Sequence, residues 1–147
     1  MIEFFFDCSS PWTYLGFHNI QPLAVELGAS IRWRPILVGG IFNSVNPSVY
    51  FSREHPVPAK QAYQSKDLQD WARLAGLAIK FPPKVFPVNS VKAMRGCIFL
   101  EPQGKLVDFA QAVFIGELFH LFRGELDGAC RLLVGADFED VLALQLQ

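Results

Sequence analysis

The chain has 147 residues, a length that fits one domain or one small domain with an insertion. Hydrophobic residues make up 51% and charged residues 18%, and the formal net charge is −1. This near-neutral balance carries no electrostatic signal for nucleic acid or an anionic membrane surface. No apolar run reaches the ~18 residues that indicate a membrane helix. The N-terminal segment lacks the basic run of a signal peptide.

The three cysteines are odd in number and widely spaced. Such spacing predicts neither a disulfide framework nor a paired-cysteine metal site. We therefore expect no metal and a reduced, cytoplasmic setting.

The opening of the chain predicts a strand, a helix and a second strand. A short apolar run over 2–6 predicts a buried strand. Ser10 directly before Pro11 predicts a helix start, because serine caps helices and proline suits the first helical position. Alternating residues over 30–34 predict the second strand, which a right-handed crossover would make parallel to the first.

The first helix is expected to end at Gly28 and to kink at Pro22. Its apolar face is predicted to contain Leu15, Leu23 and Leu27. Glycine, asparagine and proline over 38–58 predict a loop. Apolar spacing and capping residues predict further helices over 60–77, 89–100, 106–123 and 138–146, with a proline-rich connector over 81–87.

The turn between the first strand and the first helix is the strongest candidate site. A helix start offers unpaired backbone N–H groups and the positive end of a dipole, which favour a thiolate over a thiol. The Ser10 hydroxyl could donate a hydrogen bond to a thiolate there and so lower the pKa of a bound thiol. The alternative is that Ser10 acts only as an N-cap.

Residues 6–16, Phe-Asp-Cys-Ser-Ser-Pro-Trp-Thr-Tyr-Leu-Gly, resemble the opening motif of the 2-hydroxychromene-2-carboxylate isomerase and kappa-class glutathione transferase family. Further similar motifs follow in the family's order over 33–42, 66–72, 86–95 and 108–114. This resemblance implies an α/β fold of the thioredoxin-like, DsbA-like type with an inserted helical subdomain. DsbA-like oxidoreductases carry Cys-Pro-x-Cys at this turn, where this chain has Ser10 and Thr13. Glutathione is therefore implied as the source of the sulfur.

The resemblance also implies a division of the chain. Residues 1–38 would form the N-terminal βαβ half of the thioredoxin-like domain, 39–124 the helical insertion and 125–147 a remnant of the C-terminal thioredoxin part. The family's later Val-Pro pair is missing, since Val57-Pro58 lies in another region. The C-terminal half is thus expected to be incomplete, as in a shortened member. A small sheet with an exposed edge is poorly stable alone, and a homodimer is one way to cover it.

The resemblance implies roles for particular residues. Ser10 would be the catalytic residue that activates the glutathione thiol. Glutathione would be bound by Asn46, Lys60 and Asp137. The substrate pocket would contain Trp12, Phe42, Phe86, Asn89 and Arg95. Either Arg95 or Lys84 would meet a substrate carboxylate. Each of these residues has a purely structural alternative, as a turn, cap, core or solvated side chain.

The implied reaction is a glutathione-dependent isomerisation of a small aromatic or electrophilic substrate from aromatic hydrocarbon breakdown. The thiolate would add to a double bond conjugated to a carbonyl, the resulting single bond would rotate, and the thiolate would leave. One alternative is a kappa-type glutathione transferase. Another is a catalytically impaired remnant that acts as a binding module. A third is a redox protein that uses Cys8.

Overall fold

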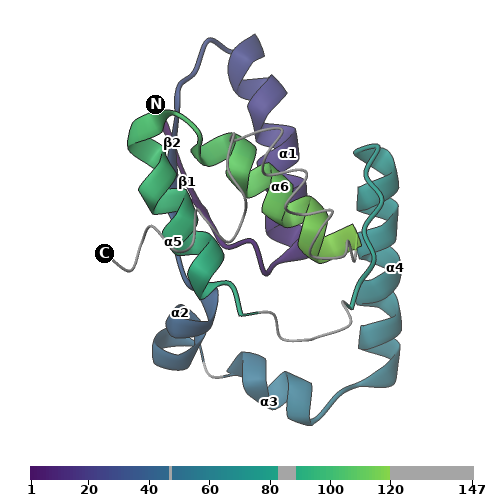
Figure 1. Ribbon diagram of the computed structural model, residues 1–147. Coiled ribbons are helices and arrows are strands. Elements are labelled where there is room, and N and C mark those ends of the chain that lie inside the picture. The colour runs from purple at the N-terminus through teal and green to yellow at the C-terminus, as the bar shows by residue number, and fades with distance from the viewer. Residues whose placement is uncertain (47, 83–88, 120–147) are drawn as a thin grey trace.

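In the computed structural model, the residues described are 1–46, 48–82 and 89–119, and every structural statement below concerns these. Within these ranges, two strands and six α-helices follow one another, with one 3-10 turn before α6. They are β1 (Ile2–Phe6), α1 (Pro11–Glu26), β2 (Ile31–Pro35), α2 (Val38–Val45), α3 (Ser48–Glu54), α4 (Pro58–Leu74), α5 (Val91–Leu100), the turn Glu101–Gln103 and α6 (Leu106–Phe119). Figure 1 shows their arrangement.

The predicted strand–helix–strand opening is confirmed, and β1 and β2 pair in parallel. The helices predicted over 60–77 and 89–100 correspond to α4 and α5. The helix predicted over 106–123 corresponds to α6 as far as Phe119. The remainder of that prediction, the helix over 138–146 and most of the connector over 81–87 lie outside the described residues.

The prediction of a loop over 38–58 is wrong, because α2 and α3 occupy most of it. Two glycines in the first turn of α2 had indicated a loop. A contact distant in sequence stabilises this helix start instead: the Asp7 carboxylate accepts a hydrogen bond from the Val38 N–H at 2.9 Å. Tertiary contacts of this kind override the low helix propensity of glycine.

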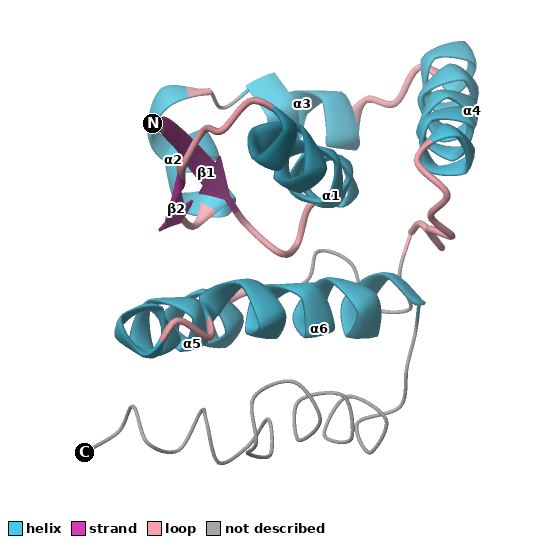
Figure 2. Ribbon diagram, turned by 90° about the horizontal axis from the view of Figure 1, so that it is seen from above, coloured by secondary structure: helices cyan, strands magenta, loops and turns pink. Residues whose placement is uncertain are grey.

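The described strands and helices lie in two layers (Figure 2). Figure 2 shows α5 and α6 in one layer, below the layer that contains β1, β2 and α1, with α4 standing beyond α1. One cluster of buried side chains joins β1, α1, α4, α5 and α6. The end of β1 and the start of α1 are therefore held from two sides.

Only one face of the sheet packs against the rest of the described chain. Phe4 lies opposite Trp33 on the packed face, and Phe5 lies opposite Arg34 on the other. Phe5 is 59% exposed, and Arg34 pairs with Glu3 on the same open face at 2.7 Å. The predicted burial of β1 is therefore correct for one face and wrong for the other, which no described helix covers.

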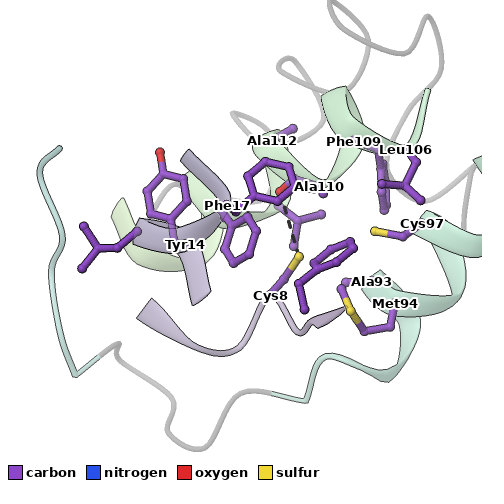
Figure 3. Packing of buried hydrophobic residues seen from close by; sticks show 14 of the residues in the cluster. Cys8, Tyr14, Phe17, Ala93, Met94, Cys97, Leu106, Phe109, Ala110 and Ala112 are labelled. Carbon is purple, nitrogen blue, oxygen red and sulfur yellow. Dashed lines mark hydrogen bonds between the residues drawn. The ribbon is translucent and has the colours of Figure 1, made fainter. Parts of the chain in front are cut away.

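Aromatic rings fill the space between the sheet, α1 and α6. Phe17 lies 4.7 Å from Trp33 and 5.2 Å from Phe114, measured between ring centroids, and Phe6 lies 5.6 Å from Phe17. Tilted and offset ring pairs at such distances contribute roughly 0.5–1.5 kcal/mol each beyond the area they bury. Figure 3 shows Tyr14 and Phe17 of α1 facing Ala110 and Ala112 of α6.

The apolar face predicted for α1 is only partly correct. Leu15 is buried, but Leu23 is 51% exposed and Leu27 is 67% exposed. The helix packs instead through a face that includes Tyr14 and Phe17, because the aromatic partners in β2 and α6 lie on that side. The helix continues past Pro22 and ends before Gly28, whose φ of 59° fits glycine at this position.

At Gly96, α5 lies close against α6. A methyl carbon at Gly96 would lie 2.6 Å from Cε1 of Phe109, whose ring is fully buried. We expect Gly96→Ala to lower the free energy of unfolding by about 1–3 kcal/mol in urea titrations, because overpacking displaces core side chains. In Gly40→Ala the added carbon would meet nothing within 4 Å, so this control should be neutral or stabilising by up to about 1 kcal/mol. Equal losses in both variants would contradict this packing.

Tyr14 should make the free energy of unfolding depend on pH in the alkaline range. Burial raises the pKa of Tyr14 above its ordinary value, and a hydrogen bond from the Gln111 amide to its hydroxyl opposes the rise only in part. The unfolded chain therefore loses this proton first, so stability is present below about pH 10 and falls as the pH rises further. Tyr14→Phe should show a shallower decline of unfolding free energy above pH ~10. Parallel declines would show that Tyr14 does not contribute.

Candidate functional site

A pocket of about 490 Å³ lies where three helices begin. The first residues of α1, α2 and α5 line it, together with Tyr50 of α3 and Phe81. Because β1 and β2 are parallel, the helices that follow them start at the same edge of the sheet. In Figure 1 the starts of α1 and α5 face the side of the molecule where α2 and α3 lie.

Ser10 is the N-cap of α1, and it lines this pocket. Its Oγ accepts a hydrogen bond from the Thr13 N–H at 3.2 Å, and its carbonyl accepts one from the Tyr14 N–H at 3.1 Å. Among the described residues, the Ser10 hydroxyl donates no hydrogen bond, so its proton can point to a ligand. Capping and ligand binding are therefore compatible at this serine.

Asp7 fixes the relative position of two helix starts. This side chain is buried, and its Oδ1 accepts a hydrogen bond from the Ser9 N–H at 2.9 Å. Its Oδ2 accepts one from the Val38 N–H, also at 2.9 Å. One carboxylate thus connects the turn before α1 to the start of α2. These two segments form two walls of the pocket.

Aromatic side chains form the apolar part of the pocket. Trp12 from α1, Phe42 from α2, Tyr50 from α3 and Phe81 all line it. Trp12 is 45% exposed, so a ligand could cover its ring. A flat apolar ligand suits such a wall, since aromatic faces stack and exclude water.

The start of α5 closes the pocket with two polar residues. The Asn89 Oδ1 accepts a hydrogen bond from the Val91 N–H at 3.2 Å. Ser90 is the N-cap of α5 but makes no side-chain capping hydrogen bond, although it is only 7% exposed. Its carbonyl accepts the Met94 N–H at 2.9 Å, as expected at a helix start.

The structure brings some of the predicted site residues together and leaves others apart. The pocket is lined by Ser10, Trp12, Phe42 and Asn89. Three predicted residues do not line it: Asn46, whose Oδ1 accepts a hydrogen bond from the Ser48 hydroxyl, and the exposed Lys60 and Arg95. The last two, Phe86 and Asp137, lie outside the described residues.

The pocket also contains residues that the sequence analysis did not predict for the site, among them Asp7, Ser90 and Tyr50. Asp7 had a usable signal, since it is a charged residue directly after an apolar strand. Ser90 had only the signal of a helix cap, since serine is common at helix starts. Tyr50 had no signal, because its helix was predicted to be a loop.

The redox alternative based on Cys8 loses support from burial. Cys8 is 1% exposed, and its Sγ lies 4.0 Å from the Ala110 carbonyl oxygen, as the dashed line in Figure 3 shows. Thiol exchange requires access for an attacking sulfur, and buried structural thiols are inert. Cys8 therefore contributes to the packing of the turn after β1 against α6.

No group of three or more His, Cys, Asp or Glu side chains able to hold a metal ion occurs in the described part of the chain. Within the same residues, no helix is both long and apolar enough to cross a membrane.

The fold and the pocket agree with comparisons to known proteins. Residues 1–125 match the family model of the DSBA-like thioredoxin domain, so the chain belongs to the DsbA-like thioredoxin family. A solved structure of 2-hydroxychromene-2-carboxylate isomerase superposes with a TM-score of 0.67 at 25% sequence identity, covering 97% of this chain and 71% of that one. The expected thioredoxin-like α/β fold is thereby confirmed.

Curated relatives point to the same group of enzymes. Over 117 residues the chain is 27% identical to 2-hydroxychromene-2-carboxylate isomerase of Pseudomonas putida, covering 78% of this chain and 54% of that protein. It is 34% identical over 92 residues to the isomerase of that name from Pseudomonas sp. strain C18, with coverages of 60% and 39%. Glutathione s-transferase kappa 2 of Caenorhabditis elegans is 29% identical over 83 residues, with coverages of 56% and 35%. The chain spans about half the length or less of these relatives.

Asp7 is expected to be needed for both stability and pocket shape. Asp7→Ala leaves the Ser9 and Val38 N–H groups without their acceptor and should lower the unfolding free energy by about 3 kcal/mol in denaturant titrations. Asp7→Asn, which keeps one carbonyl oxygen, should lose less. Amide exchange at Val38 should become faster in both variants. Unchanged exchange at Val38 would show that the carboxylate does not hold α2.

Proposed function

We propose that this chain is a glutathione-dependent isomerase of the 2-hydroxychromene-2-carboxylate type, with Ser10 as the residue that activates the thiol. The observation that carries the proposal is the Ser10 hydroxyl at the start of α1, in a pocket lined by aromatic rings. Relatives that bear the names isomerase and glutathione transferase support it.

The residues at the pocket fit a bound thiolate. The Ser10 hydroxyl proton is available, and the Trp12 N–H lies in the first turn of α1, where backbone N–H groups lack partners within the helix. The positive end of the α1 dipole adds to this preference for a negative sulfur. A volume of about 490 Å³ is within the range of pockets that hold small ligands.

Bound glutathione would supply the nucleophilic thiolate, which can add to a double bond conjugated to a carbonyl. The chain itself would hold and orient the reactants. Ser10 would donate a hydrogen bond to the sulfur and keep it ionised near neutral pH. Trp12 and Phe42 would hold a flat substrate against the sulfur and exclude water, which is the proximity effect expected of such a pocket.

Two residues predicted to bind glutathione lie outside the lining of the pocket. Asn46 and Lys60 do not line the described pocket. Binding through them would involve the part of a bound tripeptide that extends beyond the pocket. Asp137 stays a prediction for the amino end of glutathione.

A kappa-type transferase is the alternative enzyme, because the same serine and pocket would serve a thiolate that stays attached to its electrophile. The relative named as a kappa transferase favours it. Product analysis separates the two: an isomerase returns free glutathione, and a transferase consumes it.

Calorimetric titration with glutathione tests the role of Ser10. We expect saturable binding to the wild type, weakened about tenfold or more in Ser10→Ala, since a hydrogen bond to a charged group contributes about 1.5–3 kcal/mol. S-methylglutathione, which cannot form a thiolate, should bind both proteins similarly.

Ser10→Thr is the matched control, because threonine keeps a hydroxyl that can both cap and donate. It should retain most of the affinity for glutathione. Loss of binding in Ser10→Thr equal to that in Ser10→Ala, with both variants folded, would indicate that the hydroxyl is not the determinant. Equal affinity of the wild type and Ser10→Ala would refute the proposed role.

A further inference from the structure

Ser90 presents a buried hydroxyl to the pocket without a partner. The residue is 7% exposed and lines the same cavity as Ser10. As the N-cap of α5, its side chain could accept a hydrogen bond from the helix, but it makes none. Within the described residues, no other group bonds to this hydroxyl. A buried hydroxyl left unpaired costs about 1–3 kcal/mol, so its presence here calls for a ligand.

The two capping serines of the pocket differ in this respect. The Ser10 Oγ is engaged by the Thr13 N–H and therefore serves the helix as well as any ligand. The Ser90 hydroxyl serves no helix. Asn89 caps α5 in its place, through the hydrogen bond from the Val91 N–H to its Oδ1. The Ser90 side chain is thus left to face the cavity.

Electrostatics at this end of the pocket favour a negative oxygen. The helix starts of α1, α2 and α5 all reach the cavity, and each carries the positive end of a helix dipole. The Asp7 carboxylate accepts the Val38 N–H and offsets the dipole of α2. The start of α5, with ten residues behind it, has no acidic residue in its first turn. Its positive end therefore remains available beside Ser90.

We propose that the Ser90 hydroxyl and the start of α5 form a carboxylate-binding subsite in the pocket. The hydroxyl donates a hydrogen bond to a carboxylate oxygen, and the helix dipole favours the negative charge. Two cations were predicted from the sequence as partners of a substrate carboxylate. Arg95 is exposed and does not line the pocket, and Lys84 lies outside the described residues. The inference rests on the proposed function, because it names the chemical group that the same pocket would bind beside the thiolate.

Two ligands could bring this carboxylate: glutathione itself, or an aromatic substrate that lies against Trp12 and Phe42. Cinnamate, cinnamamide and glutathione are suitable probes. Cinnamate joins an aromatic ring to a carboxylate through a conjugated double bond, and cinnamamide is its uncharged counterpart. Binding of each to the wild type, Ser90→Ala and Ser10→Ala would be measured by calorimetry or by quenching of tryptophan fluorescence.

We expect Ser90→Ala to weaken cinnamate binding about tenfold and to leave cinnamamide binding within about twofold of the wild type. A loss confined to cinnamate assigns the carboxylate to the aromatic substrate. A loss confined to glutathione assigns it to glutathione. Unchanged affinity for both carboxylate probes, or equal losses for cinnamate and cinnamamide, would overturn the subsite.

Thermal unfolding of the ligand-free protein gives an independent readout. Ser10→Ala removes a capping hydrogen bond and should lower Tm, whereas Ser90→Ala removes an unpaired buried hydroxyl and should leave Tm unchanged or raise it. A fall in Tm for Ser90→Ala as large as that for Ser10→Ala would show a structural role and contradict the inference. The two proposals remain separable, since Ser10→Ala should affect glutathione and leave cinnamate binding in place.

Discussion

The pocket depends on one buried carboxylate. Asp7 accepts hydrogen bonds from the Ser9 and Val38 N–H groups, and so it joins the two chain segments that leave the parallel strands. The same two segments are also joined directly beside it, where the Ile36 N–H donates a hydrogen bond to the Phe6 carbonyl oxygen at 2.9 Å. Buried charged groups persist when their hydrogen-bonding capacity is used, and both carboxylate oxygens of Asp7 are used.

Packing behind the pocket keeps this arrangement in place. Phe6, next to Asp7, contacts Phe17 of α1 and Phe114 of α6. Cys8, on the other side of Asp7, is buried against the Ala110 carbonyl oxygen of α6. Residues far along the chain therefore support the Ser10 turn, although they contribute no side chain to the described pocket. A site held at hydrogen-bond precision requires such support from packed neighbours.

Local signals in the sequence were sufficient for the start of the chain. Ser10 before Pro11 and the alternation over 30–34 correctly predicted the β1–α1–β2 unit, because caps and strand periodicity are short-range features. The helices α2 and α3 were missed, since α2 begins at a contact with Asp7, thirty-one residues away in sequence. Exposure of Leu23 and Leu27 was also unpredicted, because the packed face of α1 is chosen by its aromatic partners.

The candidate site was predictable to a similar extent. Ser10, Trp12, Phe42 and Asn89 line one pocket, and the motifs that suggested them lie at helix starts. Asn46, Lys60 and Arg95 followed from resemblance alone, and in the structure their side chains lie away from that pocket. Ser90 could not be distinguished from an ordinary cap until its burial and its missing hydrogen bond were known.

The most direct test of the role of Ser10 is the ionisation of a bound thiol. Glutathione labelled with carbon-13 at the cysteine β-carbon would be titrated with pH in the presence of excess protein, with the chemical shift reporting the thiolate. We predict a midpoint well below the ordinary cysteine value of about 8.5 in the wild type, returning toward it in Ser10→Ala. A midpoint equal to that of free glutathione, at concentrations where glutathione is bound, would contradict the assignment of Ser10 as the thiol-activating residue.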